Sequence, residues 1–251
     1  MLRVAALELP HRYGVPAAQL VALDQALGPL RGEVDLVALP EMALTGYCSP
    51  RGDFDLGAWA EPLEGPTMRH CADLAREHGV ALLVPLVEEV EGTWPLRRYN
   101  SAVLFDATGR RVGHWRKRHP WHPEVWASPG DLGTPVVELG GLRLAVAICY
   151  DVHFLTDDAG EALASADVLL YPSAWVDDDA TDARGPLLAD LARRHGLWVV
   201  NPNWGPGLPR VRGQGGSRVV DPAGREVVRA LGAGGPRVVR ATVDARAASR
   251  H

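Results

Sequence analysis

The chain has 251 residues, of which 47% are hydrophobic and 23% are charged, and its formal net charge is −5. This composition is typical of a soluble globular domain, and the acidic balance argues against nucleic acid or an anionic membrane as a partner. The three cysteines form no CxxC pair, and charged residues and proline interrupt the apolar N-terminal stretch. The sequence therefore predicts a cytoplasmic protein with no disulfide framework, no signal peptide and no membrane span.

Nine short apolar runs are predicted as strands of a single α/β domain that spans residues 1–251, with 245–251 as a loose tail. They show little alternation between apolar and polar residues, which is typical of strands that are covered on both faces. The predicted strands are Val4–Leu9, Val34–Leu39, Val80–Val87, Ser101–Phe105, Leu142–Cys149, Asp167–Tyr171, Leu197–Val200, Ser217–Val220 and Val238–Val243.

Helices are predicted between the strands, beginning at Pro16, Pro66 and Pro186. Proline at the first helical position and glycine just past the end mark helix boundaries, and Gly79 and Gly196 follow the second and third helices. Turn sequences at 106–109 and 221–224 each join two strand-like runs and predict hairpins, so the sheets should be mixed rather than purely parallel.

Three reactive side chains follow buried strands, where α/β folds gather functional groups. Cys149 is placed to act as a nucleophile, Glu41 as a general base near apolar walls, and Lys117 as a cation that stabilises a thiolate or an oxyanion. Each has an ordinary alternative: a buried structural cysteine, a solvated glutamate and a basic surface run. Together the three make a complete set for covalent catalysis.

Five segments in the same order resemble the motifs of the nitrilase (carbon–nitrogen hydrolase) superfamily, and the resemblance covers nearly the whole chain. They are Leu39–Tyr47, Trp115–Lys117, Pro129–Asp131, Ile148–Asp151 and Pro172–Trp175. The resemblance implies a Glu41–Lys117–Cys149 triad, a second glutamate at Glu124, and an α-β-β-α sandwich with mixed central sheets. It also implies a homodimer or higher homo-oligomer, and a mechanism that needs no metal or other cofactor.

The implied reaction is hydrolysis of a small amide by water through a thioester on Cys149. Lys117 and the backbone N–H of Tyr150 are expected to hold the oxyanion, and Tyr47, Tyr150 and Trp175 are expected to bind substrate. Hydrolysis of an N-carbamoyl compound and a true nitrilase activity use the same triad and stay open. A catalytically silent oligomeric binding protein of this fold is the alternative from a different class.

Other features leave the substrate open. The resemblance is weaker at 153–155 and 190–195, which leaves the surrounding pocket and any subunit interface undefined. The acidic run Asp177–Asp179 favours either a cationic substrate or a solvated loop, and metal binding by the histidines at 114, 119 and 122 is disfavoured. Four of the eight tryptophans, at 115, 121, 126 and 175, are expected to border the Cys149 cleft, and those at 59, 94 and 198 to be core or interface residues.

Overall fold

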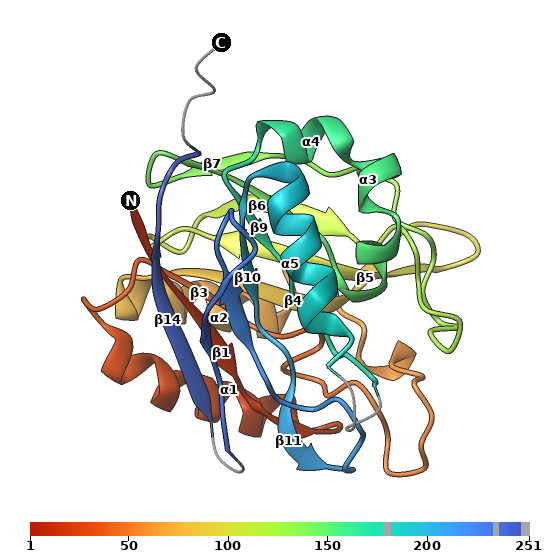
Figure 1. The fold of residues 1–251 in the computed structure, drawn as a ribbon. Coiled ribbons are helices and arrows are strands. Elements are labelled where there is room, and N and C mark those ends of the chain that lie inside the picture. The colour runs from red at the N-terminus through yellow and green to blue at the C-terminus, as the bar shows by residue number, and fades with distance from the viewer. Residues whose placement is uncertain (178–181, 233–235, 247–251) are drawn as a thin grey trace.

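Two six-stranded sheets pack face to face, with helices on the outer face of each (Figure 1). The computed structural model describes residues 1–177, 182–232 and 236–246. Residues 178–179 of the acidic run and 247–251 of the expected tail therefore lie outside the described residues. Of the tail, Arg246 is described, and its guanidinium donates to backbone carbonyls of the Leu163–Ala166 segment. None of the described helices is long and apolar enough to cross a membrane.

The first sheet has the order β14-β1-β3-β4-β5-β6, with β1, β3 and β4 parallel and the remaining pairs antiparallel. Helices α1 and α2 cover its outer face. The strands are β1 (Leu2–Glu8), β3 (Leu36–Ala38), β4 (Ala81–Val90), β5 (Arg97–Phe105), β6 (Arg111–Arg116) and β14 (Arg237–Val243), and the helices are α1 (Pro16–Leu27) and α2 (Pro66–His78).

The second sheet has the order β13-β12-β10-β9-β8-β7, again with three parallel strands, β8, β9 and β10, at its centre. Helices α3, α4 and α5 cover it. Its elements are β7 (Val137–Leu139), β8 (Leu142–Val146), β9 (Val168–Leu170), β10 (Trp198–Asn201), β12 (Arg218–Val220), β13 (Glu226–Arg229), α3 (Leu155–Asp158), α4 (Gly160–Ser165) and α5 (Arg184–His195). A two-stranded sheet joins β2 (Pro10–Arg12) to β11 (Gly205–Leu208), and short 3-10 helices are η1 (Gly28–Leu30), η2 (Gly57–Trp59) and η3 (Cys149–His153).

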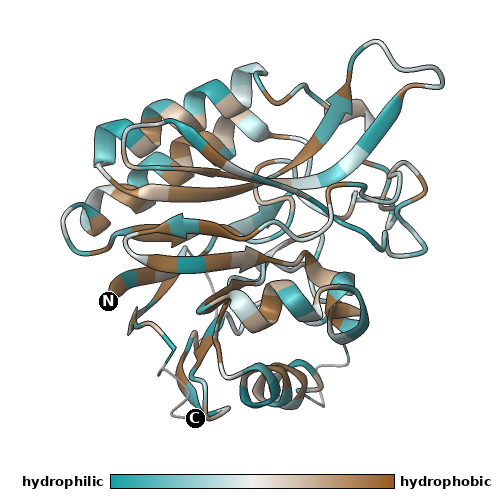
Figure 2. Cartoon of the chain, turned by 90° about the horizontal axis from the view of Figure 1, so that it is seen from above, coloured by the Kyte–Doolittle hydropathy of each residue, from teal (hydrophilic) through white to brown (hydrophobic). Residues whose placement is uncertain are grey.

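Alternate residues of the central strands enter different cores. In β1, Val4 and Ala6 face the second sheet, while Ala5 and Leu7 face the helices. All four are fully buried, because successive side chains of a strand point to opposite faces and both faces are covered. This layering explains the uninterrupted apolar runs, and Figure 2 shows the two sheets lying between outer helices.

The expected α-β-β-α sandwich is confirmed, and all nine predicted strands and both hairpins are present. Most predicted strand boundaries are off by one to four residues; β8, for example, ends at Val146 rather than Cys149, and helix α5 begins at Arg184 rather than Pro186. The chain leaves the strand early because Cys149 has a φ of +46° and begins η3. Among the described residues, β2, β7, β11, α3 and α4 were not predicted, since three to six residues are too few to show a periodic pattern.

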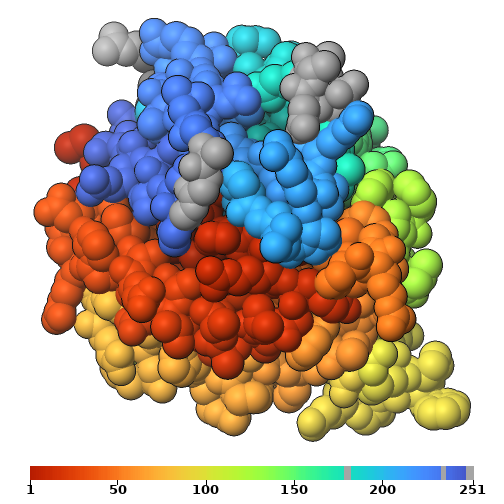
Figure 3. Space-filling view, turned by 90° about the horizontal axis from the view of Figure 1, so that it is seen from below, coloured from red at the N-terminus to blue at the C-terminus, as the bar shows by residue number. Residues whose placement is uncertain are grey.

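Trp115 tests the packing between the sheets. It is 1% exposed in the inter-sheet core, and its indole N–H donates to the Pro135 carbonyl at 2.8 Å. Trp115→Ala should lower the free energy of unfolding by about 3–5 kcal/mol, measured by urea titration, because a large cavity replaces the ring. Trp94 is the control: it is 98% exposed on the β4–β5 connection, which projects from the surface (Figure 3), and so is not a core residue. Trp94→Ala should change stability by less than about 0.5 kcal/mol; equal losses for the two variants would contradict the layered packing.

Candidate active site

The predicted catalytic residues lie in loops that follow strands of both sheets. Glu41 follows β3, Lys117 directly follows β6, and Cys149 follows β8. Ala174, which follows β9, donates its backbone N–H to the Glu41 carboxylate at 2.9 Å and so joins the two sheets at this end of the sandwich. Because ends of neighbouring strands meet at one edge of a sheet, residues that are far apart in sequence converge here.

Lys117 lies fully buried between two carboxylates. Its ammonium donates to Glu41 at 2.8 Å and to Glu124 at 2.7 Å, and all three side chains are 0% exposed. The backbone of Lys117 is held by β5, because its N–H donates to the Asn100 carbonyl at 2.7 Å. The structure therefore brings Glu124 together with Glu41 and Lys117, as the resemblance implied.

Asn100 completes this cluster and was missed as a site residue by sequence reasoning. Its side-chain amide donates to Glu41 at 2.7 Å and to Glu124 at 2.6 Å, so it holds both carboxylates. The available signal was a polar residue directly before the predicted strand that begins at Ser101; the observed strand β5 begins earlier, at Arg97, and includes it. A neutral amide there is needed because buried carboxylates require donors.

Cys149 occupies a strained turn. Its φ of +46° lies in the left-handed region, which is costly for a residue with a Cβ, and strain of this kind is found at functional sites. Two hydrogen bonds hold the turn: the Cys149 N–H donates to the Pro172 carbonyl at 3.0 Å, and the Tyr171 hydroxyl donates to the Cys149 carbonyl at 2.9 Å. The side chain is thereby directed out of the strand toward the ends of both sheets.

The thiol is protonated at rest in this environment. Burial raises the pKa of Cys149 well above its ordinary value, and the negative charge of Glu41 adds to the rise. Lys117 and the N–H of Ala174 act in the opposite direction on this pKa. A thiol with a raised pKa needs a base to become a nucleophile, and the Ala174 N–H that faces it also binds the Glu41 carboxylate.

The cluster keeps its cation charged. Burial alone would lower the pKa of Lys117, but the attraction of Glu41 and Glu124 outweighs burial and raises it. Burial raises the pKa of Glu124, with Lys117 opposing and Glu41 adding to the rise. The ammonium is thus a fixed positive charge in a low-dielectric site, where it acts strongly on a developing oxyanion.

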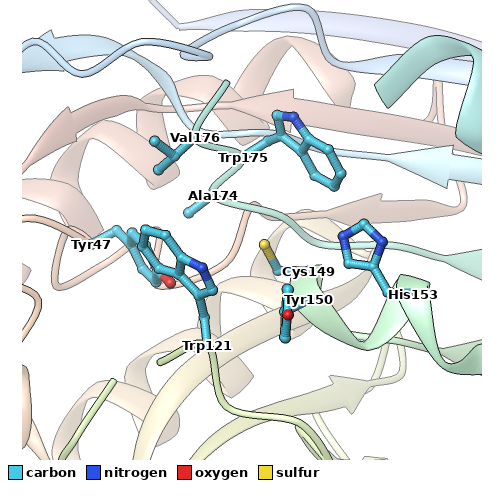
Figure 4. Close-up of a pocket in the computed structure, with 8 residues that line it drawn as sticks. All are labelled: Tyr47, Trp121, Cys149, Tyr150, His153, Ala174, Trp175 and Val176. Carbon is cyan, nitrogen blue, oxygen red and sulfur yellow. The ribbon is translucent and has the colours of Figure 1, made fainter. Parts of the chain in front are cut away.

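A cavity of about 130 Å³ opens above the thiol (Figure 4). All three predicted substrate-binding residues line it, together with residues that were not predicted. The lining residues are Tyr47, Trp121, Cys149, Tyr150, His153, Ala174, Trp175 and Val176. Tyr47 and Trp121 lie on one side of the sulfur and His153 on the other (Figure 4).

The expectation for the tryptophans was half right. Trp121 and Trp175 line the cavity, whereas Trp115 lies in the core between the sheets and Trp126 donates its indole N–H to the Phe54 carbonyl at 2.8 Å outside the lining. The described residues contain no group of three or more His, Cys, Asp or Glu side chains placed to hold a metal ion.

Comparison with known proteins matches residues 3–250 to the carbon–nitrogen hydrolase family model. An (R)-stereoselective amidase of Pseudomonas sp is 31% identical over 91% of this chain and 81% of its own length. An N-carbamoylputrescine amidase of Solanum lycopersicum is 36% identical over 50% of this chain. That match covers 43% of the Solanum enzyme. A hydrolase of Pseudomonas protegens is 36% identical over 69% of this chain and 59% of its own length. A C145A mutant of the Nesterenkonia AN1 amidase has a TM-score of 0.82 at 28% identity, covering 98% of this chain and 90% of that one. The sequence resemblance is confirmed.

Asn100→Asp tests the charge balance of the cluster. The new carboxylate cannot donate to Glu41 or Glu124 and adds a negative charge beside them, which raises the pKa of the Cys149 thiol further. Alkylation of Cys149 by iodoacetamide at pH 7, followed by mass spectrometry, should slow about tenfold for each unit of that rise. Gln25→Glu makes the same change on an exposed turn of α1 and should alkylate at the wild-type rate. A folded Asn100→Asp protein that reacts as fast as wild type would contradict this role for Asn100.

Proposed function

Because the chain belongs to the carbon–nitrogen hydrolase family, we propose that it hydrolyses small amides through a thioester on Cys149. One observation carries the proposal. The Ala174 N–H binds the Glu41 carboxylate at 2.9 Å and faces the Cys149 thiol, and the same carboxylate accepts from Lys117 at 2.8 Å. The proposed base and cation thus lie in one hydrogen-bonded cluster, which Ala174 connects to the cavity that it lines together with Cys149.

Acylation begins when Glu41 takes the proton of the Cys149 thiol. The sulfur attacks the amide carbon, an S–C bond forms, and the carbonyl π electrons move onto oxygen. The Lys117 ammonium and the Tyr150 backbone N–H at the start of η3 stabilise this oxyanion. The C–N bond then breaks as Glu41 returns its proton to the leaving nitrogen, which departs as ammonia or an amine and leaves a thioester.

Deacylation uses the same groups. Glu41, again a carboxylate, takes a proton from water, and the hydroxide oxygen attacks the thioester carbon. The second oxyanion is held as before and collapses with cleavage of the C–S bond, and the thiolate recovers its proton from Glu41. Glu124 and Asn100 hold Glu41 and Lys117 in place throughout, through the contacts at 2.6–2.8 Å described above.

The lining favours a small acyl group without a carboxylate. A dry cavity of about 150 Å³ holds a molecule the size of benzene, so about 130 Å³ suits a comparable acyl group. No Asp, Glu, Lys or Arg is among the described lining residues, and burial lowers the pKa of His153, which keeps it neutral at pH 7. A substrate carboxylate would lose its hydration there without gaining a cationic partner.

Hydrolysis of N-carbamoyl amines is the second candidate. The similarity to an N-carbamoylputrescine amidase supports it, and the Asp177 carboxylate accepts the indole N–H of the lining residue Trp175 at 3.0 Å. Release of carbon dioxide together with ammonia would identify this reaction. Consumption of a nitrile substrate would instead identify a nitrilase. The homo-oligomer implied by the resemblance and the cytoplasmic location stay predictions.

Removing the nucleophile tests the mechanism. Cys149→Ala should lower kcat on small amides such as isobutyramide by at least about 10⁴-fold, because no thioester can form. Ammonia release gives the rate, and intact-protein mass spectrometry of the wild type during turnover should show an added acyl mass that is absent from the variant. Cys71→Ala, at a buried cysteine of α2, is the control and should keep activity. Undiminished ammonia release by Cys149→Ala would refute the mechanism, and a wild type that neither acylates nor releases product would favour the silent binding protein.

A matched series tests the substrate class. Isobutyramide should give a kcat/KM at least about tenfold above succinamate, which carries a carboxylate into the neutral cavity. Val176→Arg, at a lining residue that is 40% exposed, should narrow this ratio by supplying a cation, whereas Val176→Gln adds length without charge and should not. Equal wild-type rates on the two amides would refute the substrate class while leaving amide hydrolysis in place.

A further inference from the structure

Asp151 is a buried carboxylate that the mechanism above does not use. It lies two residues after Cys149 in η3 and is 7% exposed. One carboxylate oxygen accepts the His119 backbone N–H at 2.8 Å, and the other accepts the Ile148 backbone N–H at 3.3 Å. It therefore bonds to two separate stretches of backbone rather than to substrate-facing groups.

Each of these stretches carries a catalytic residue. Ile148 directly precedes Cys149, whose left-handed φ of +46° must be held by its surroundings. His119 lies two residues after Lys117, on the loop that leaves β6. A single side chain thus ties the turn of the nucleophile to the loop of the cation.

A second set of contacts joins the same two segments farther from Cys149. The His119 ring stacks on Phe154 with centroids 4.0 Å apart and bonds to the Asp158 carboxylate. The Arg118 guanidinium donates to the Asp158 carbonyl at 2.7 Å. These side chains fix the position of α3 against the loop, but only Asp151 reaches the backbone next to Cys149.

We propose that Asp151 is a positioning residue whose ionised carboxylate holds the Lys117 loop and the Cys149 turn in register for attack. The inference rests on the proposed function, because register matters only if these two residues act together. A carboxylate accepts two N–H donors at once, one on each oxygen. The protonated acid carries an O–H in place of one acceptor, so one tie weakens while the fold remains.

The surroundings of Asp151 place its protonation in a pH range where alkylation can be measured. Burial raises its pKa to about 6, although the His119 and Ile148 N–H groups and the positive charge of Lys117 lower it. The small cleft that Asp151 borders is lined by further charged or titratable groups, namely Arg116, Arg118, His119 and Asp158. The tie is therefore complete at pH 7 and weakens as the pH falls through about 6.

Protonation of Asp151 should lower the reactivity of Cys149 but raise the stability of the fold. The pKa of Asp151 is about 6 in the fold and 3.8 for an unperturbed aspartate, so the folded state binds this proton more tightly. Protonation between about pH 6 and pH 4 therefore favours the folded state. A loss of reactivity near pH 6 caused by Asp151 should occur without a matching loss of stability due to this group.

Asp151→Asn is the direct test. The amide oxygen can accept one backbone N–H, but its NH₂ group faces the other, so one tie is lost at every pH. We expect iodoacetamide alkylation of Cys149, and kcat on isobutyramide, to fall about ten- to 100-fold, the cost of one unpaired buried donor. KM should change little, and the fall in alkylation rate near pH 6 that we expect for the wild type (the acid limb) should be absent. Asp157→Asn, the same change at an exposed position, should keep wild-type rates and the limb.

Each outcome bears on the proposal. The proposal is overturned if Asp151→Asn keeps the wild-type rates and the wild-type fall in alkylation rate near pH 6. Its pH dependence is overturned if the variant reacts more slowly but still shows that fall. If the variant does not fold, the wild type decides: an alkylation limb near pH 6 with an unchanged melting temperature supports the proposal, and a parallel fall in melting temperature overturns it. If alkylation behaves as expected but no amide is cleaved, the proposed function fails, and what stands is the effect of Asp151 on the reactivity of Cys149.

Discussion

The fully buried ammonium of Lys117 is the constraint on which the rest of the site depends. A charge removed from water is stable only when opposite charges and hydrogen bonds replace its hydration. Glu41 and Glu124 supply the opposite charge at 2.8 and 2.7 Å. These carboxylates need donors in turn, which come from the Asn100 amide and the Ala174 N–H. Removing any member would leave a buried charge or donor unpaired, so the five residues form a unit.

The sandwich brings these residues together because its two sheets end at the same place. Glu41, Lys117 and Asn100 belong to the first sheet and its loops, whereas Cys149 and Ala174 follow strands of the second. The hydrogen bond from Ala174 to Glu41 spans 133 residues of sequence. Neither sheet alone contains both the proposed base and the proposed nucleophile. The apolar contact between the sheets, which includes Trp115, therefore determines catalytic geometry as well as stability.

The sequence predicts more of the fold than of the site. Burial on both faces gives uninterrupted apolar runs, so the central strands are visible, and reactive residues after such runs identify Glu41, Lys117 and Cys149. Glu124 was found through the resemblance, because a glutamate in a long loop carries no local signal. Asn100 was missed because it lies inside a strand and is neutral. The expectation that Trp115 borders the Cys149 cleft was wrong, because its ring is buried in the core between the sheets.

Three buried carboxyl groups around Lys117 differ in chemistry because their partners differ. Glu41 binds one ammonium, one amide and one backbone N–H, and it faces the thiol. Glu124 shares the ammonium and the amide, and the nearby charge of Glu41 helps to raise its pKa. Asp151 has only backbone donors and a more distant cation, so burial dominates and its pKa rises to about 6. Glu41, the proposed base, is the one of the three whose backbone donor, Ala174, also lines the cavity with Cys149. Carboxyl groups in three environments are thus proposed to act as the base, the counter-charge and the tie, and the environment assigns each role.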